Sequence, residues 1–507
     1  MTVVSRALIP QTAVPEVELI RNLGEANHVV LGLANTDGKP VLIGSNTKLE
    51  EQIKDLLGCE LLDLALDLGA KAKENCVTIL PTAKVRIVVV GLGEDVDVAP
   101  ETLRQGVASA VRAITGLESE APVNVAISVD ANSESTIQAA TEGAILGAYT
   151  FTPLSNKDPK PGIASILIVS ASTSATAKAA FEAGRSAASA TCVVRDWVNL
   201  PANSLYPESF ADSAKHYLSD VKVKVEILDE KALAKGGYGG ILTVGGGSDR
   251  QPRLFRAEYA PRGAKFHLVF VGKGITFDTG GYNIKPTEGM LTMKCDMSGA
   301  AAVIGAIHAI AELGLDIRVT AYAAMAENMI SGNSYRPSDV LTMYNGMTVE
   351  NANSDAEGRL VMADALARAN EDEPDLVVDI ATLTGACIVA LGNDIGGLMV
   401  SDDETADILL NAAEAAGEPF WQLPITPRLK KGLESKVADL KSSGGRMGGA
   451  MIAAAFLQNF VAEDTAWAHL DIAGPAFNSE GPWGHTPTGG TGAGVRTLVA
   501  LAATLQG

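Results

Sequence analysis

The residues best suited to chemistry lie in the octet NSDAEGRL, residues 353–360, where Asp355, Glu357 and Arg359 occupy alternate positions. In an extended or turn-like backbone, side chains at this spacing point the same way, so two carboxylates and a guanidinium would converge on one point. Like charges held that close repel each other unless a cation lies between them. The octet alone therefore allows two interpretations: a cation site, or a solvated acidic loop closed by an ion pair with the arginine.

A second set of polar residues follows a predicted strand upstream. The segment GKGITFDTGGYNIKP, residues 272–286, presents Lys273, Asp278 and Lys285 among several glycines, and the later segment MKCDMSGAAA places Asp296 directly before a predicted helix. Each aspartate alone also has a structural interpretation. Aspartate is a favoured helix cap, as Asp296 would be, and it forms Asx turns, as Asp278 would.

Taken together, the acidic residues favour a metal centre. Three carboxylates in separate glycine-rich loops, those of Asp278, Asp296 and Asp355, and a fourth at Glu357 would repel one another strongly without cations. Hard oxygen ligands suit Mg²⁺, Mn²⁺ or Zn²⁺, and carboxylates shared between loops suit a pair of ions about 3.5–4 Å apart. The six histidines are scattered singly and no HExxH motif occurs, so a histidine-based zinc site is not expected.

Net charge restricts the classes of partner. The 507 residues include 40 basic and 60 acidic side chains, for a formal net charge of −20. This charge would repel nucleic acid phosphates and anionic lipid, so we expect neither nucleic acid nor membrane as a partner. The apolar run at 299–315 is interrupted by His308 and Glu312 and is short for a bilayer span.

The cysteines and the N-terminus indicate the compartment. The five cysteines form no CxxC pair, which is typical of buried thiols in a reducing environment. The first residues lack the uninterrupted apolar core and small-residue cleavage site of an export signal. We therefore expect a soluble cytoplasmic protein.

Strand-like and helical patterns alternate along the chain, which predicts an α/β fold with sheets covered by helices. In the first third, strands are predicted at 28–34, 39–44, 85–93 and 124–129 and helices at 49–67, 100–116 and 134–149. Further on, strands are predicted at 163–170, 223–229, 264–272, 316–325, 375–382, 396–402 and 466–472, and helices near 299–313, 358–370, 405–416, 449–461 and 493–505.

Length and composition predict the domain organisation. A chain of 507 residues favours two domains. The alanine-rich segment at 173–200 has high helix propensity and ends before Pro201. We predict a smaller N-terminal α/β domain at 1–172, a long connecting helix at 173–200 and a larger α/β catalytic domain with a central mixed sheet at 201–507.

The segments around the acidic residues resemble those of the leucyl aminopeptidases, which are two-metal cytosol exopeptidases with a signature close to NTDAEGRL. The resemblance covers essentially all of residues 190–480 and rests on blocks in the family's order and spacing: VGKGITFD, NIKP, MKCDM, AENM, YRPSD, NSDAEGRL, MADAL, ATLTGA, KVADLKSSGGRMGGA and WAHLDIAGP. The first 170 residues share only the family's general α/β character.

The resemblance implies a metal-dependent hydrolase that releases leucine and other apolar residues from peptides with a free N-terminus. It implies two divalent ions, Mn²⁺ or Zn²⁺ with Mg²⁺ as the third choice, held by Lys273, Asp278, Asp296, Asp355 and Glu357. A lysine that binds metal must be neutral, and lowering its pKa from about 10.4 to below 7 costs roughly 4–5 kcal/mol, which two adjacent dications could supply. A charged Lys273 should instead pair with a carboxylate.

The resemblance also implies roles for residues that do not bind metal. Lys285 and Arg359 would be catalytic, and Arg359 would hold a bicarbonate ion that shuttles a proton. Met293, Thr382 and Gly385 would line an apolar pocket for the first side chain, with core packing as the alternative for each. Family members form hexamers, so a homohexamer is implied. His469 and Arg446 are expected to be structural or subunit-contact residues.

Five positions depart from the family pattern: Thr279, Tyr282, Asn283, Ser338 and Ser354. Ser338 stands where the family has glycine, and Tyr282 could narrow the site and so change the range of substrates.

Two other functions stay open. A two-metal phosphoesterase would use similar carboxylates, but a metal-binding lysine in an acidic chain fits a free-amine substrate better. A catalytically silent scaffold would be expected to lack one of the ligands or Lys285, and all of these positions are filled.

Overall fold

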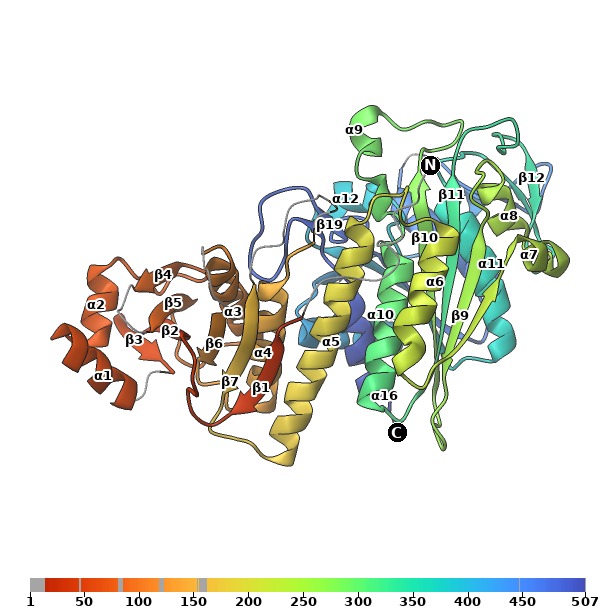
Figure 1. Ribbon diagram of the computed structural model, residues 1–507. Helices are drawn as coiled ribbons and strands as arrows, with labels where there is room; N and C mark the ends of the chain where they lie inside the picture. The colour runs from red at the N-terminus through yellow and green to blue at the C-terminus, as the bar shows by residue number, and fades with distance from the viewer. Residues whose placement is uncertain are drawn as a thin grey trace. The chain divides into compact units, whose positions relative to one another are not determined.

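The computed structural model describes residues 14–44, 47–80, 85–117, 123–152, 154, 162–445 and 447–506. It comprises two compact units (Figure 1): one holds Val193–Ser479 and the residues from Gly489 onward, and the other holds the residues up to Cys192 with Glu480–Thr488. Both units are α/β, which confirms the predicted fold class. The long helix α5 (Ala175–Asn199) spans the division between them, and the boundaries at 172 and 200 remain predictions.

The unit with the N-terminal residues contains a seven-stranded sheet with the order β1-β7-β6-β2-β5-β4, and β3 pairs with β2. Its strands are β1 (Glu16–Ile20), β2 (His28–Thr36), β3 (Lys39–Ile43), β4 (Val77–Leu80), β5 (Arg86–Gly93), β6 (Val123–Ser128) and β7 (Ile163–Val169). Its helices are α1 (Thr47–Leu57), α2 (Leu61–Asp67), α3 (Pro100–Thr115), α4 (Glu134–Ala148) and the first part of α5.

Alternate residues of the central strand β2 enter two separate cores. Val30 packs in a cluster with residues of α3 and α4, whereas Val29 packs in a cluster with residues of α1 and α2. The two-residue period of a strand sends neighbouring side chains to opposite faces, so helices cover both faces. The single helix predicted at 49–67 is wrong, because Gly58 has a φ of +71° and this left-handed residue separates α1 from α2.

The larger unit contains an eight-stranded mixed sheet with the order β16-β15-β18-β14-β10-β11-β9-β8. Its strands are β8 (Lys224–Leu228), β9 (Arg253–Tyr259), β10 (His267–Asp278), β11 (Arg318–Asn328), β14 (Leu376–Ala381), β15 (Gly396–Val400), β16 (Phe420–Gln422) and β18 (Ala466–Asp471). Two small sheets contain β12 (Val340–Thr342), β13 (Thr348–Glu350) and β17 (Leu440–Lys441), and β19 (Phe477–Asn478) and β20 (Gly489–Gly490).

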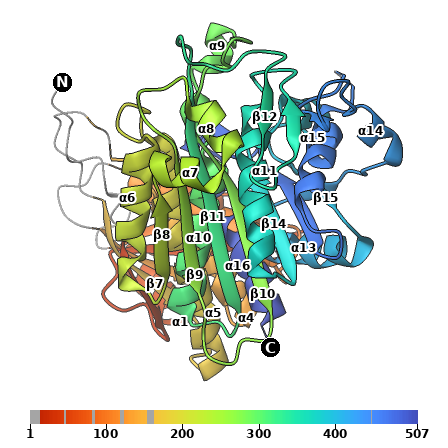
Figure 2. The ribbon, with the colours of Figure 1, turned by 90° about the vertical axis from the view of Figure 1, so that its right-hand side faces the viewer.

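The helices of this unit surround the sheet (Figure 2). They are α6 (Pro207–Tyr217), α7 (Glu230–Gly236), α8 (Gly239–Gly245), α9 (Thr287–Met290), α10 (Ser298–Leu313), α11 (Glu357–Ala369), α12 (Gly385–Leu391), α13 (Asp403–Ala416), α14 (Pro427–Lys431), α15 (Gly449–Leu457) and α16 (Val495–Leu505). Short 3-10 helices are η1 (Leu218–Asp220), η2 (Met293–Cys295), η3 (Asn370–Asp372) and η4 (Gln458–Phe460).

Strand β10 is held between α10 and α11. Val269 and Val271 pack in one cluster with residues of α11, whereas the α-carbon of Gly272 faces Gly299 and Ala300 of α10. The helical stretch Thr287–Leu313 is long and apolar enough to cross a membrane, with a mean hydropathy of 1.3, but 72% of its apolar window is buried. Such burial is typical of the core helix of a globular domain.

Candidate metal centre

Three adjacent parallel strands bring polar residues to one edge of the sheet. Strand β10 ends at Asp278, β11 ends at Asn328, and Thr382 directly follows β14. Because the carboxyl ends of parallel strands meet at the same edge, residues far apart in the sequence become neighbours. Helix α11 begins at Glu357, and Asp355 lies in the turn before it.

Three of the predicted metal ligands converge most closely. Asp278, Asp355 and Glu357 each offer a carboxylate oxygen, and these oxygens lie within 4.8 Å of one another. The ammonium group of Lys285 lies between two of them, with Nζ 2.8 Å from Asp278 Oδ2 and 2.5 Å from Asp355 Oδ1. The octet and the loop after β10 therefore meet at one point, with a cation between their carboxylates.

The other two predicted ligands complete the group on the Glu357 side. Lys273 Nζ lies 2.9 Å from Asp296 Oδ1 and 2.9 Å from Glu357 Oε1, which is the pairing expected of a charged lysine. Thr382 holds both partners, since its carbonyl oxygen accepts a hydrogen bond from Lys273 Nζ at 3.0 Å and its hydroxyl donates to Asp296 Oδ1 at 2.8 Å. We call Lys273, Asp278, Lys285, Asp296, Asp355 and Glu357 the acidic cluster.

Burial and like charges disturb the protonation of this cluster. Burial raises the pKa of Asp278 to about 6, with the charge of Glu357 acting in the same direction. Burial, with Glu357, also raises the pKa of Asp355. Burial alone would lower the pKa of Lys273, but the carboxylates of Asp296 and Glu357 raise it above its usual value. The cluster is therefore a place where additional positive charge is favourable.

Two buried oxygens test whether the cluster fits a metal ion. Asp296 Oδ2 and Glu357 Oε2 have no hydrogen-bond partner among the described residues. A buried acceptor without a partner costs about 1–3 kcal/mol, so natural proteins seldom contain one without a ligand or another reason. Carboxylates with available oxygens are the ligands that hard divalent ions prefer. The residues of the cluster thus fit a metal centre.

Arg359 does not pair with the carboxylates of its own octet, which contact Lys285 and Lys273 instead. Its Nη1 donates a hydrogen bond to the carbonyl oxygen of Ser442 at 3.0 Å, and its Nε has no hydrogen-bond partner among the described residues. Burial lowers the pKa of Arg359 to about 10, which leaves the guanidinium charged at neutral pH. A buried cation with an available N–H group suits an anion.

The three predicted pocket residues have different surroundings. Thr382 contacts the acidic cluster directly, and Met293 begins η2, which leads to Asp296. Gly385 begins α12, is exposed, and has open space where a side chain would extend. Their role in binding the first side chain remains a prediction.

Two residues for which no role was predicted, Asn328 and Ser354, organise the site. Asn328 Nδ2 donates to Asp278 Oδ1 at 2.8 Å and to the carbonyl oxygen of Ser354 at 2.9 Å. Ser354 Oγ in turn donates to the carbonyl oxygen of Gly280 at 2.7 Å. These bonds tie the loop after β10 to the octet. The available signal was the position of Asn328, three residues after the strand predicted at 316–325.

The buried imidazole of His469 takes part in the packing of the sheet. Its Nδ1 lies 2.5 Å from Asp379 Oδ1, and Trp467 Nε1 donates to Asp379 Oδ2 at 2.7 Å. This arrangement suits the structural role expected for His469. Arg446 lies outside the described residues.

Family comparison agrees with the geometry. The model of the cytosol aminopeptidase family, catalytic domain, matches residues 192–499, and that of the family's N-terminal domain matches residues 41–157. The chain belongs to the cytosol aminopeptidase family. It is therefore a peptidase of that family, a hydrolase, which confirms the resemblance found in the sequence.

Individual relatives match almost the whole chain. A probable cytosol aminopeptidase of Cutibacterium acnes is 50% identical, with 97% of each chain covered. One of Streptomyces griseus is 46% identical, with 94% of this chain and 95% of the relative covered. The solved structure of the bottromycin maturation enzyme BotP in complex with Mn matches with a TM-score of 0.83 at 35% identity, covering 95% of this chain and 99% of that chain.

Proposed function

We propose that this member of the cytosol aminopeptidase family is a two-metal aminopeptidase that releases N-terminal leucine and other apolar residues from peptides with a free N-terminus. The observation that carries the proposal is the acidic cluster, in which carboxylates from the end of β10, the end of η2 and the start of α11 meet around two lysines and leave buried oxygens without partners among the described residues.

The proposed ligands of the two divalent ions are Lys273, Asp278, Asp296, Asp355 and Glu357. Mn²⁺ is our first choice because a relative of similar fold was solved in complex with Mn, and Zn²⁺ and Mg²⁺ are the alternatives. When bound, such ions activate water, polarise the scissile carbonyl and hold the substrate's amine.

Lys285 supplies a fixed positive charge for the oxygen that becomes negative during hydrolysis. Burial alone would lower the pKa of Lys285, but Asp278 and the other carboxylates raise it above its usual value, so its ammonium stays protonated at neutral pH. A preorganised N–H donor in a water-poor site stabilises a developing oxyanion strongly.

Arg359 would hold a bicarbonate ion through its available Nε–H group, and this anion would accept and return a proton. Met293, Thr382 and Gly385 would bind the first side chain. As for other members of the family, we propose a homohexamer in the cytoplasm.

Metal titration tests the proposal. The protein is stripped with a chelator, Mn²⁺ is added back in steps, and hydrolysis of leucinamide is followed together with bound metal. We expect activity to return as two ions bind per chain, and we expect Asp355→Asn to bind less metal whereas Asp403→Asn, on an exposed turn of α13, binds the same amount. Full activity in the stripped protein, or with one ion per chain, would contradict the two-metal site.

A further inference from the structure

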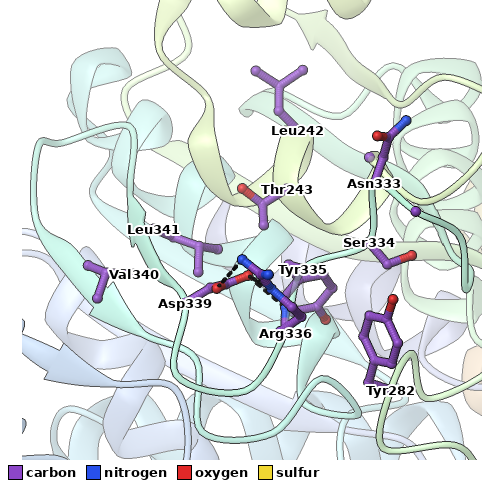
Figure 3. A pocket seen from close by; sticks show the side chains of 12 residues that line it. Leu242, Thr243, Tyr282, Asn333, Ser334, Tyr335, Arg336, Asp339, Val340 and Leu341 are labelled. Carbon is purple, nitrogen blue, oxygen red and sulfur yellow. Dashed lines mark hydrogen bonds and ion pairs between the residues drawn. The ribbon is translucent and has the colours of Figure 1, made fainter.

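A cavity of about 570 Å³ lies in the larger unit, and Tyr282, from the loop between Asp278 and Lys285, is one of its lining residues (Figure 3). Its walls include Tyr282, Tyr335, Arg336, Asp339 and Leu341. This volume is in the range of sites that bind small molecules or short peptide segments. We call it the distal pocket.

Two residues of the distal pocket are linked to the segments that carry the predicted metal ligands. Tyr282 belongs to the loop between Asp278 and Lys285, and its hydroxyl donates a hydrogen bond to the carbonyl oxygen of Ser331 at 3.2 Å. Tyr335 donates to the carbonyl oxygen of Ser354 at 2.8 Å, immediately before Asp355. The residues that form this cavity are therefore held by the same loops that carry the acidic cluster.

Strand order places the distal pocket on one side of the cluster. The predicted residues for the first side chain include Thr382 and Gly385, which follow β14, whereas the residues 331–336 follow β11. Strand β10, which carries Lys273 and Asp278, lies between β14 and β11. A peptide that directs its first side chain to the β14 side can extend the rest of its chain to the β11 side.

The chemistry of the distal pocket suits a peptide with a terminal carboxylate. Tyr282 supplies exposed ring surface, and the side chain of Arg336 is 71% exposed. Asp339 contacts Nε and Nη2 of Arg336, at 3.2 and 3.0 Å, which is one edge of the guanidinium. The other edge can form a charge-assisted pair with a carboxylate.

We propose that the distal pocket binds the C-terminal part of a short peptide substrate and that Arg336 pairs with its α-carboxylate. This inference rests on the proposed aminopeptidase function. It assigns Tyr282 to the wall of the distal pocket, in place of the narrowing of the site expected from its position in the sequence.

Substrates of different length test the inference. The wild-type protein, Arg336→Gln and the control Arg262→Gln, on an exposed turn before β10, are assayed on leucinamide, on the tetrapeptide Leu-Gly-Gly-Gly and on its C-terminal amide. We expect Arg336→Gln to lower kcat/KM about two- to fivefold for the free-acid tetrapeptide, through KM, because one solvent-exposed charge-assisted pair is lost. Leucinamide and the amidated tetrapeptide should be unaffected.

The outcomes separate this inference from the function on which it rests. Equal losses on leucinamide and the tetrapeptide, or no loss on either, would overturn the assignment of Arg336. Failure of the wild-type protein to cleave leucinamide would instead overturn the aminopeptidase proposal. A second variant, Tyr282→Ala, should raise KM for the tetrapeptide only. A changed preference between leucinamide and phenylalaninamide in this variant would show that Tyr282 acts on the first residue of the substrate, which would contradict its assignment to the distal pocket.

Discussion

Lys273 approaches Glu357 because the residue that follows Glu357 in α11 has no side chain. Lys273 Nζ lies 2.9 Å from Glu357 Oε1, and a Cβ atom added to Gly358 would lie 2.6 Å from the same nitrogen. Real Cβ atoms essentially never come that close to another heavy atom. The path of the lysine side chain and the start of α11 are thus fitted to each other.

Substitution of Gly358 by alanine should disturb the acidic cluster without unfolding the protein. The added methyl group must displace the end of Lys273, which is buried and held by three partners. Displacement of a site group by about 1 Å commonly costs about 100-fold in rate, so we expect a loss of kcat/KM of that order and weaker Mn²⁺ binding. The control is Gly289→Ala in α9, where the added Cβ would meet no atom within 4 Å. Equal activity of both variants would show that Lys273 is not needed at its observed position.

Lys285→Ala should reduce turnover much more than metal content. Lys285 contacts Asp278 and Asp355 as a cation and is proposed to stabilise the developing oxyanion, so its removal should lower kcat by about 100- to 1,000-fold. Because the metal ligands proposed here are all retained, bound Mn²⁺ per chain should change little. Unchanged turnover would remove Lys285 from the mechanism, and a parallel loss of metal would make it a ligand-organising residue.

Ser338→Gly should stabilise the protein. Ser338 occupies a position where the resemblance predicted glycine, and its φ of +74° lies in the left-handed region that L-residues avoid. Glycine relieves this strain, but it also has more backbone freedom in the unfolded chain, which offsets part of the gain. We therefore expect the free energy of unfolding to rise by about 0.5–1 kcal/mol. Urea denaturation of the two proteins measures the difference, and a lower midpoint for the glycine variant would refute the argument.

The buried pair of His469 and Asp379 should make stability depend on pH. Burial alone would lower the pKa of His469, but the charge of Asp379 and its hydrogen bond raise it above the usual 6.5. A histidine with a raised folded-state pKa contributes stability that is fully present below the unfolded-state pKa and is lost as the pH rises through the folded-state pKa. Asp379→Asn removes the counter-charge. The free energy of unfolding of the wild-type protein should therefore exceed that of the variant by more at pH 6 than at pH 9. Denaturant unfolding of both proteins at both pH values measures this difference in the free energy of unfolding. A difference that does not change with pH would contradict the raised pKa of His469.

The sequence predicted the elements that carry a strong local pattern. A strand was expected at 264–272 from its apolar run, but β10 extends to Asp278, so Lys273 and Asp278 lie in the strand and not in a loop after it. Helix α10 was expected from its alanine-rich composition and is present. Strands β1 and β9 were not predicted, because Glu16–Ile20 is short and Arg253–Tyr259 alternates charged and apolar residues near the edge of the sheet. The break at Gly58 depends on one left-handed residue, which helix propensity does not reveal.

The candidate site was predictable in its ligand types and less so in its contacts. Asp278 and Asp355 could be grouped because carboxylates in separate glycine-rich loops are unusual. The interpretation of the octet as an ion pair with Arg359 was wrong. Asp355 pairs with Lys285 from another loop, and Arg359 binds the carbonyl oxygen of Ser442. Asn328 was not predicted because its amide carries no charge that would mark it as a site residue. Its contact with Asp278 depends on the pairing of β10 with β11, which the sequence does not show.

The most direct test of the aminopeptidase proposal compares leucinamide with N-acetyl-leucinamide on the Mn²⁺-loaded protein. The proposal requires the free amine to be held in the metal centre, so acetylation should abolish hydrolysis while leaving the scissile amide unchanged. We predict cleavage of leucinamide and none of the acetylated substrate. Equal rates of cleavage would contradict the account, because the amine would then have no role.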